Sequence, residues 1–208
     1  MKTSDNRAFW DKVAGIYGNI VYHGRKAQKA YDTMTDLIGT HLNRNMDVLE
    51  LACGPGILSF QIVNQCRSLE ATDFSQCMIA EAKDKNHSRR LHFSVQDATN
   101  LPYGQQTFDA VLMANALHIM PEPEQVLENI KSVLKPEGIF LCPTFTREVG
   151  KYTVKERLME LAGFRTYSRW THESFLEFLR QNGFRIADEK IIRGHNFPIS
   201  FVMACKQK

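Results

Sequence analysis

Small residues follow a short apolar run and leave the backbone open to a ligand. The run 47–51 leads into Ala52, Gly54 and Gly56, after which a helical pattern begins. Residues without large side chains let a ligand approach such a turn, and the first turn of a helix has unpaired N–H groups. Glu50 lies in this run, where burial of an unpaired carboxylate is costly. The pattern favours a ligand ammonium as the partner of Glu50, with a structural hydrogen-bond network as the alternative.

Three polar residues follow the next apolar runs. Asp73 closes the second run, nineteen residues after Gly54, while Asp97 and Asn115 follow the third and fourth runs. In an open parallel sheet, ligands bind beyond the carboxyl ends of the strands, near the point where the strand order reverses. At that place Asp73 can accept hydrogen bonds from two ribose hydroxyls. Both aspartates can also be helix caps or solvated turn residues.

The elements that must position these residues predict an α/β fold. Five apolar runs alternate with helical patterns and occupy residues 47–51, 69–73, 91–96, 108–114 and 138–143. This alternation indicates right-handed crossovers and a parallel sheet, and continuous apolar runs suit strands covered on both faces. Between the fourth and fifth runs, apolar residues from Val126 to Leu134 share one face of a predicted helix. A turn at 135–138 is expected to end this helix.

Two further strands close the sheet at the C-terminus. Residues 184–193 turn through Gly194 into a segment whose alternate positions, from Phe197 to Cys205, are apolar. Alternation at period two predicts a half-buried strand, so we expect an antiparallel hairpin. The complete prediction is a doubly wound, mostly parallel seven-stranded sheet with this hairpin at its end.

Helical patterns flank the block. A stripe from Ala27 to His41 predicts one helix, and Thr171 can cap another that runs to Gly183. We interpret residues 1–208 as a single domain, with an N-terminal helical cap at 1–42 and an inserted lid at 145–169.

Composition narrows the class of protein. The chain has 208 residues, of which 43% are hydrophobic and 24% charged, with a net charge of +3. This balance is typical of a soluble globular domain and gives no reason to expect nucleic acid or a membrane as a partner. The five cysteines form no metal-binding or disulfide pattern, and the N-terminus lacks the apolar core of a signal peptide. We expect a cytoplasmic protein without a bound metal; the oligomeric state is not predicted.

The loop resembles the first motif of the class I S-adenosylmethionine-dependent methyltransferases, acidic-x-Gly-x-Gly-x-Gly. Here the motif is Glu50-x-Ala52-x-Gly54-x-Gly56, with Ala52 in place of the first glycine. The resemblance implies a Rossmann-like methyltransferase fold with S-adenosylmethionine as cofactor and S-adenosylhomocysteine as product. It further implies that Gly54 and Gly56 flank the methionine part of the cofactor and that Glu50 holds its amino group.

Later motifs continue this resemblance over nearly the whole chain. The segment that begins at Asp73 is similar to the second motif, which implies that Asp73 binds the ribose and that Phe74 or Met78 lies against adenine. The segment with Asp97 and Ala98 is similar to the third motif, which implies that Asp97 binds the adenine amino group. In relatives the N-terminal segment that corresponds to 9–17 folds over the cofactor, and from this segment Tyr17 can shield the sulfonium by a cation–π contact. Asn115, beyond the fourth strand, completes the cofactor-binding set.

The reaction implied is in-line displacement of a methyl group from sulfonium to a nucleophilic atom. The protein aligns and desolvates the reactants, and His118 is a candidate general base. The fourth strand ends in Ala114-Asn115-Ala116-Leu117, not in the Asn/Asp-Pro-Pro-aromatic motif of amino-group methyltransferases that act on DNA bases or glutamine. We therefore expect a small-molecule acceptor. The alternatives are a nicotinamide-dependent oxidoreductase and a non-catalytic cofactor-binding protein.

Overall fold

The computed structural model describes residues 4–16, 24–147, 165–193 and 197–207. A mixed sheet with the strand order β3-β2-β1-β4-β5-β8-β6, in which β7 also pairs with β8, forms its centre. The parallel strands are β1 (Asp47–Leu51), β2 (Ser68–Asp73), β3 (Leu91–Val95), β4 (Phe108–Leu112) and β5 (Leu134–Leu141). The chain moves outward from β1 to β3 and then returns to β4. The strand order therefore reverses between β1 and β4, which confirms the doubly wound fold.

An antiparallel hairpin completes the sheet, as predicted. β7 (Phe184–Ile192) pairs with β8 (Ile199–Lys206), which pairs on its other side with β5. The expectation that this last strand is half-buried is wrong, because it is buried on both faces from Ile199 to Val202. Its place between β5 and β7 puts one face in each apolar core. The two-residue strand β6 (Thr144–Phe145) also pairs with β8 and is an eighth strand where the sequence predicts seven.

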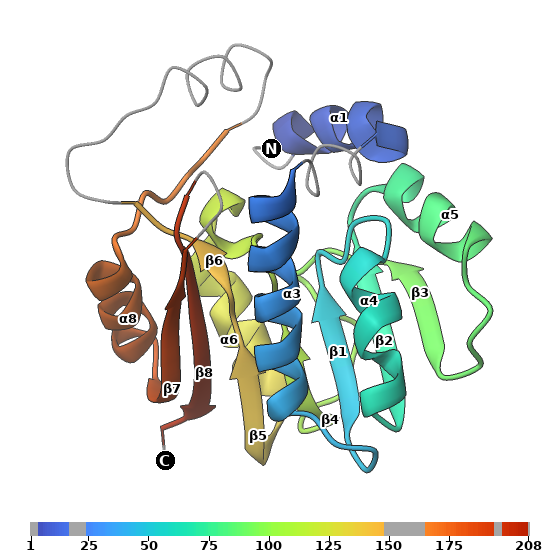
Figure 1. Ribbon diagram of the computed structural model, residues 1–208. Helices are drawn as coiled ribbons and strands as arrows, with labels where there is room; N and C mark the ends of the chain where they lie inside the picture. The colour runs from blue at the N-terminus through green and yellow to red at the C-terminus, as the bar shows by residue number, and fades with distance from the viewer. Residues whose placement is uncertain (1–3, 17–23, 148–164, 194–196, 208) are drawn as a thin grey trace.

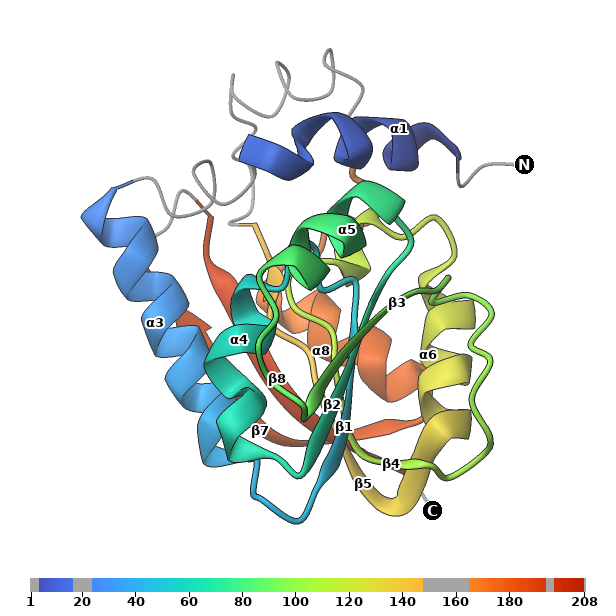
Figure 2. The ribbon, with the colours of Figure 1, turned by 90° about the vertical axis from the view of Figure 1, so that its right-hand side faces the viewer.

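Helices cover both faces of the sheet (Figures 1 and 2). One face packs against α3 (Arg25–Thr40), α4 (Ile57–Ile62) and α5 (Gln76–Asp84), and the other against α6 (Pro123–Val133) and α8 (His172–Gln181). Val48 of β1 packs on the α3 side and Leu49 on the α6 side. Successive strand residues point to opposite faces, so Glu50 points toward α3 and α4. None of the described helices is both long and apolar enough to cross a bilayer.

One helix boundary differs from the prediction and another agrees with it. α6 ends at Val133, but β5 begins at the next residue, so the turn predicted at 135–138 lies inside a strand. The pairing of β5 with β4 changes register between Phe108 and Ala110, and the extra residues of β5 are accommodated there as an irregularity. α8 begins with the predicted cap: the side chains of Thr171 and Ser174 each accept the other residue's backbone N–H.

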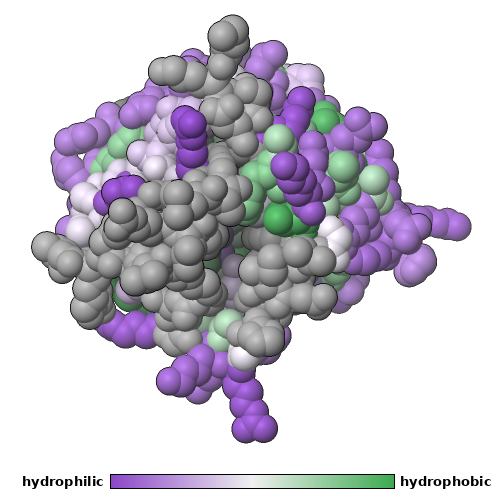
Figure 3. All heavy atoms as spheres, turned by 90° about the horizontal axis from the view of Figure 1, so that it is seen from above, coloured by the Kyte–Doolittle hydropathy of each residue, from purple (hydrophilic) through white to green (hydrophobic). Residues whose placement is uncertain are grey.

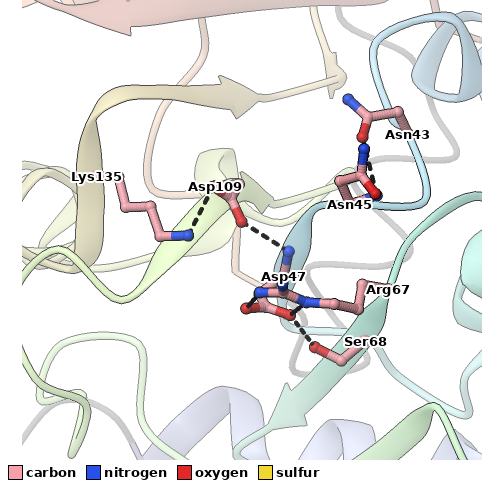
Figure 4. Close-up of polar contacts among 7 residues, drawn as sticks. All are labelled: Asn43, Asn45, Asp47, Arg67, Ser68, Asp109 and Lys135. Atoms are coloured by element: carbon pink, nitrogen blue, oxygen red, sulfur yellow. Dashed lines mark hydrogen bonds and ion pairs between the residues drawn. The ribbon is translucent and has the colours of Figure 1, made fainter.

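Paired charges hold the amino ends of the strands (Figure 4). Arg67 donates to both carboxylate oxygens of Asp47, and the Ser68 hydroxyl donates to Oδ1 of the same carboxylate at 2.7 Å. Asp109 accepts a hydrogen bond from Lys135 Nζ at 2.7 Å and another from the backbone N–H of Asp47 at 2.8 Å. The hydrogen bond from Arg67 lowers the pKa of Asp47 to about 2. We call these five residues the amino-edge cluster.

Candidate cofactor site

The loop between β1 and α4 has the backbone conformation that its small residues predict. Ala52, Gly54 and Gly56 have φ of 54°, 56° and 78°, all in the left-handed region. A Cβ on Gly56 would lie 2.7 Å from the Phe93 ring, so both the backbone angle and the space require glycine there. Ala52, which stands in place of the first glycine of the motif, therefore reaches the backbone angle of that glycine. This conformation is strained for a residue with a Cβ.

Glu50 is a buried carboxylate without a cationic partner among the described residues. It is 2% exposed and accepts a hydrogen bond from Ser59 Oγ of α4 at 2.5 Å. Burial and the nearby charge of Asp73 raise the pKa of Glu50 to about 8, against the hydrogen bond from Ser59, which acts to lower it. A ligand ammonium beside this carboxylate would favour its ionised form.

A first pocket opens between Glu50 and α3. Tyr31 and Met34 line it from α3, and Asn115 lines it from the loop that follows β4. Asn115 has a φ of 52°, and its amide nitrogen donates to the Tyr31 hydroxyl at 3.3 Å. Its side-chain oxygen is buried and has no hydrogen-bond partner in the described part of the chain. A carboxylate thus lines the pocket, and an unpaired buried acceptor belongs to a residue of the same wall; the two together suit a ligand that brings hydrogen-bond donors.

A second pocket shares one wall residue, Ala52, with the first pocket. Its wall includes Phe74, Asp97 and Ala98. Aromatic and apolar side chains predominate elsewhere in the wall: Trp10, Ile119, Met120, Pro121 and Tyr167. An apolar slot with a few polar groups at its rim suits a planar heterocycle. Figure 3 views the molecule from above, where the described surface is mostly hydrophilic and a small group of apolar atoms, in green, lies among the hydrophilic ones.

Asp73 occupies the last position of β2, next to pocket-lining Phe74. One carboxylate oxygen accepts the N–H of Gly54 and the other the N–H of Ser75, both at 2.9 Å. Burial, with a smaller contribution from the carboxylate of Asp11 in α1 (Ser4–Val13), raises the pKa of Asp73 to about 6, although the two backbone hydrogen bonds act to lower it. Each carboxylate oxygen has a second lone pair, so both can accept ligand hydroxyls as well. Asp73 does not itself line either pocket and is 7% exposed.

The N-terminal helix lies over this edge (Figure 2). Ser75 Oγ donates to Asp11 Oδ1 at 2.5 Å, and the Arg7 guanidinium lies 5.3 Å from the centroid of the Phe74 ring. With Trp10 in the wall of the second pocket, α1 covers the segment after β2. The other N-terminal candidate, Tyr17, falls outside the described residues.

Two candidates lie away from the pocket walls. Met78 is 2% exposed inside α5 and lines neither pocket, whereas Phe74 does. His118, in the short helix η3 (Leu117–Ile119), is 8% exposed, and its Nδ1 lies 3.1 Å from Thr144 Oγ1. Burial lowers the pKa of His118 to about 4, so the ring is neutral at pH 7. Its carbonyl oxygen accepts the N–H groups of Tyr167 and Ser168, which ties the described end of segment 145–169 to η3.

Sequence reasoning missed Tyr31 and Met34 as pocket residues. Both belong to the α3 stripe, which periodicity assigns to the core, and both are indeed buried. Only the position of α3 opposite Glu50 reveals their second role. No group of three or more histidine, cysteine or acidic side chains in the described residues is placed to hold a metal ion.

Comparisons with known proteins identify relatives of this chain. Residues 48–138 match the family model described as a methyltransferase domain. The ubiquinone/menaquinone biosynthesis C-methyltransferase UbiE of Rickettsia massiliae is 29% identical over 161 residues, which cover 66% of this chain and 64% of the relative. UbiE of Rickettsia bellii is 28% identical over 62% of this chain and 59% of the relative. The chain thus spans somewhat less than two thirds of the length of these relatives.

Solved structures show the same fold. The [4+2]-cyclase SpnF has a TM-score of 0.79 at 22% identity, with 97% of this chain and 96% of that chain covered. The 1,6-didemethyltoxoflavin-N1-methyltransferase of Burkholderia thailandensis, solved with S-adenosylhomocysteine, has a TM-score of 0.78 at 19% identity, with 99% and 88% covered. Residues 48–138 thus form a methyltransferase domain, and the motifs and fold of the chain resemble those of class I S-adenosylmethionine-dependent methyltransferases.

Proposed function

We propose that this chain is an enzyme that transfers a methyl group from S-adenosylmethionine to a small-molecule acceptor. The observation that carries the proposal is Glu50, a buried carboxylate that faces a pocket and has no cation beside it in the described residues. The cofactor has an ammonium group of the complementary charge. Relatives named as a quinone C-methyltransferase and a toxoflavin N-methyltransferase support a small-molecule acceptor.

The residues present fit this cofactor along its length. Glu50 and the unpaired Asn115 oxygen would hold the ammonium end, in the first pocket. Asp73 would accept the ribose hydroxyls between the two pockets. Phe74 would lie against the purine, with Asp97 at its edge, in the second pocket. When bound, the cofactor supplies an activated methyl group, and the chain's own contribution is to align and desolvate the reactants.

His118 remains a prediction as general base. Its ring is buried and neutral, so it can accept a proton, but it lines neither described pocket. We expect His118→Ala to leave cofactor affinity unchanged, because no pocket contact is removed. Turnover that falls at least tenfold with unchanged affinity would assign it a catalytic role, whereas unchanged turnover would exclude it.

Calorimetric titration tests the proposal directly. We expect micromolar dissociation constants for S-adenosylmethionine and for S-adenosylhomocysteine, with NADH as the negative control. Incubation with quinone precursors and aromatic heterocycles should then produce S-adenosylhomocysteine in step with a methylated product. No heat with either sulfur cofactor would refute the assignment.

A protein that binds the cofactor without transferring its methyl group is the second candidate. It is favoured by the described pocket walls: their acids, Glu50 and Asp97, are both assigned to the cofactor, and His118 lines neither pocket. Tight binding of S-adenosylmethionine without any S-adenosylhomocysteine formed across the acceptor panel would support this candidate instead.

A further inference from the structure

The loop after β3 is tied to α6 beside the second pocket. Asn129, on α6, donates through its side-chain nitrogen to the carbonyl oxygen of Ala98 at 3.0 Å. Ala98 and its neighbour Asp97 both line the pocket. The two partners lie 31 residues apart in the chain, so only the tertiary structure brings them together.

The hydrogen bond from Asn129 is connected to the Asp97 carboxylate through a single peptide group, the one between Ala98 and Thr99. The carbonyl of Ala98 and the N–H of Thr99 belong to the same peptide group, which is planar and trans, so the two point in opposite directions. The carbonyl accepts from Asn129, while the Thr99 N–H donates to Asp97 Oδ1 at 2.9 Å. The Thr99 hydroxyl donates to the same oxygen at 2.7 Å. Asn129 therefore fixes the plane of the peptide that orients Asp97, and hydrogen bonds in such a chain strengthen one another.

The far end of the loop is fixed independently. The Tyr103 hydroxyl donates to Glu70 Oε1 at 3.0 Å, and Ser94 Oγ donates to the same oxygen at 2.6 Å. The Tyr103 ring meets Phe108 edge to face, with centroids 5.2 Å apart. The start of the loop is held by Gln96, whose N–H donates to the carbonyl of Asp73. Between these two ends, the bond from Asn129 holds the loop at Ala98.

Helix propensity gives no reason for asparagine at position 129. Asparagine is a poor residue for a helix interior, because its side chain competes for backbone hydrogen bonds. Asn129 lies beside Ile130, on the border of the buried face of α6. The side chain is used instead for the long-range bond to Ala98.

We propose that Asn129 is a positioning residue for purine recognition: through the peptide between Ala98 and Thr99 it aims the Asp97 carboxylate at a 6-amino group. This inference rests on the proposed function, because it takes the ligand of the second pocket to be an adenosine. With Asp97 Oδ1 occupied by Thr99, Oδ2 remains as the acceptor for the purine. Asn129 does not line the pocket, so its effect is indirect.

Discrimination between two ligands measures this role. S-inosylhomocysteine carries a 6-oxo group where S-adenosylhomocysteine carries the 6-amino donor, so an oriented Asp97 should favour the adenosyl ligand. In the parent protein, the dissociation constant of S-inosylhomocysteine divided by that of S-adenosylhomocysteine should be well above one. We expect this ratio to fall about five- to tenfold in Asn129→Asp and in Asn129→Ala, the scale of one hydrogen bond. Asn129→Ala separates loss of the donor from the added charge of aspartate.

Asn86 provides the matched control. Its side-chain nitrogen donates to the carbonyl of Leu91 at 2.8 Å, the same kind of bond at the opposite end of β3. We expect Asn86→Asp to change stability but not the discrimination ratio. A ratio that is unchanged in both Asn129 variants, or equally reduced in Asn86→Asp, would overturn the positioning role.

A measurement without ligand separates this inference from the proposed function. Amide hydrogen exchange should accelerate at Thr99 in Asn129→Ala, because the peptide that donates to Asp97 is released, while Gln96, bonded to the carbonyl of Asp73, stays protected. Unchanged exchange at Thr99 would refute the tie whatever the protein binds. Faster exchange in a protein that binds no adenosyl ligand would preserve the tie and refute its use in purine recognition together with the proposed function.

Discussion

Two acidic residues of one strand differ in their partners and in the direction in which their pKa is shifted. Asp47 and Glu50 both belong to β1. At the amino edge Asp47 accepts two hydrogen bonds from Arg67, and its pKa falls to about 2. At the carboxyl edge Glu50 is buried with only the Ser59 hydroxyl as a described partner, and its pKa rises to about 8. The amino edge supplies its own cations, whereas none of the described residues places a cation beside Glu50 at the carboxyl edge.

Backbone strain follows the same division. Ala52 and Asn115, two of the three described non-glycine residues with positive φ, line the first pocket at the carboxyl edge. The third, Gln106, is exposed in the turn before β4. Strained conformations and buried carboxyl groups without a cationic partner both lower stability, and proteins retain them where they serve binding. The missing cation beside Glu50 and the strained backbone therefore mark the candidate site as clearly as its sequence motif does.

Replacement of Glu50 should have the largest effect and tests the comparison most directly. We expect Glu50→Gln to weaken S-adenosylhomocysteine binding about a hundredfold, because a charge-assisted bond to the ammonium is lost in a buried place. Asp47→Asn is the matched control, since it removes a carboxylate from the same strand at the other edge. It should leave affinity within twofold and lower Tm by about 3 °C or less. Equal losses of affinity in both variants would abolish the distinction between the edges.

Replacement of Asp73 should rank second. We expect Asp73→Ala to weaken binding of both S-adenosylmethionine and S-adenosylhomocysteine about ten- to a hundredfold, through loss of one or two ribose hydrogen bonds. Calorimetry with 2′-deoxyadenosyl and adenosyl ligands would sharpen this prediction, because the variant should no longer prefer the ribose form. Parent-like affinity in Asp73→Ala would place the ribose elsewhere.

The pH dependence of stability should differ in sign between the edges. The pKa values of Glu50 and Asp73 are raised from 4.5 and 3.8 to about 8 and about 6, so their contributions are complete at low pH and are lost as pH rises through these values. The pKa of Asp47 is lowered, so its contribution is present above pH 3.8 and is lost as pH falls toward 2. The lowered pKa of His118 has the opposite effect up to about pH 6.5, so the Glu50 contribution is measured above that pH. Between pH 7 and 8 we expect the free energy of unfolding without ligand to fall by about 1 kcal/mol.

Urea unfolding across this range measures the slope. Glu50→Gln should flatten it, because a neutral amide does not titrate, while Asp47→Asn should leave it unchanged. A slope that persists in Glu50→Gln would assign the titration to another group.

The smallest effect should come from relief of backbone strain. We expect Ala52→Gly to raise the free energy of unfolding by about 0.5–1 kcal/mol, because glycine adopts a positive φ without the contact made by Cβ. Gln106→Gly is the control, with a φ of 55° at an exposed turn. Both should stabilise the protein, as urea unfolding would measure, while calorimetry should find affinity changed at most about threefold. Destabilisation by Ala52→Gly would show that no strain is stored in the loop.

Particular residues show how far sequence reasoning reaches. The strands are predictable because continuous apolar runs, such as the one that became β4, suit sheets covered by helices. The loop from Ala52 to Gly56 is predictable because few residues adopt a left-handed backbone. The strand that became β8 was misread as half-buried, since alternation of apolar residues cannot reveal that Ser200 and Val202 are covered as well. Burial of the second face depends on neighbours far away in the chain.

The sequence by itself determined the parallel sheet, the carboxyl-edge acids and the resemblance of its motifs to a methyltransferase, because these depend on residue type and on spacing along the chain. Only the tertiary structure decided which acids have partners. Arg67 meets Asp47 across the edge of two strands, while Glu50 faces Tyr31 and Met34 rather than a cation. Partnership depends on distances between segments that sequence spacing does not encode, and the pKa of each carboxyl group follows from those distances.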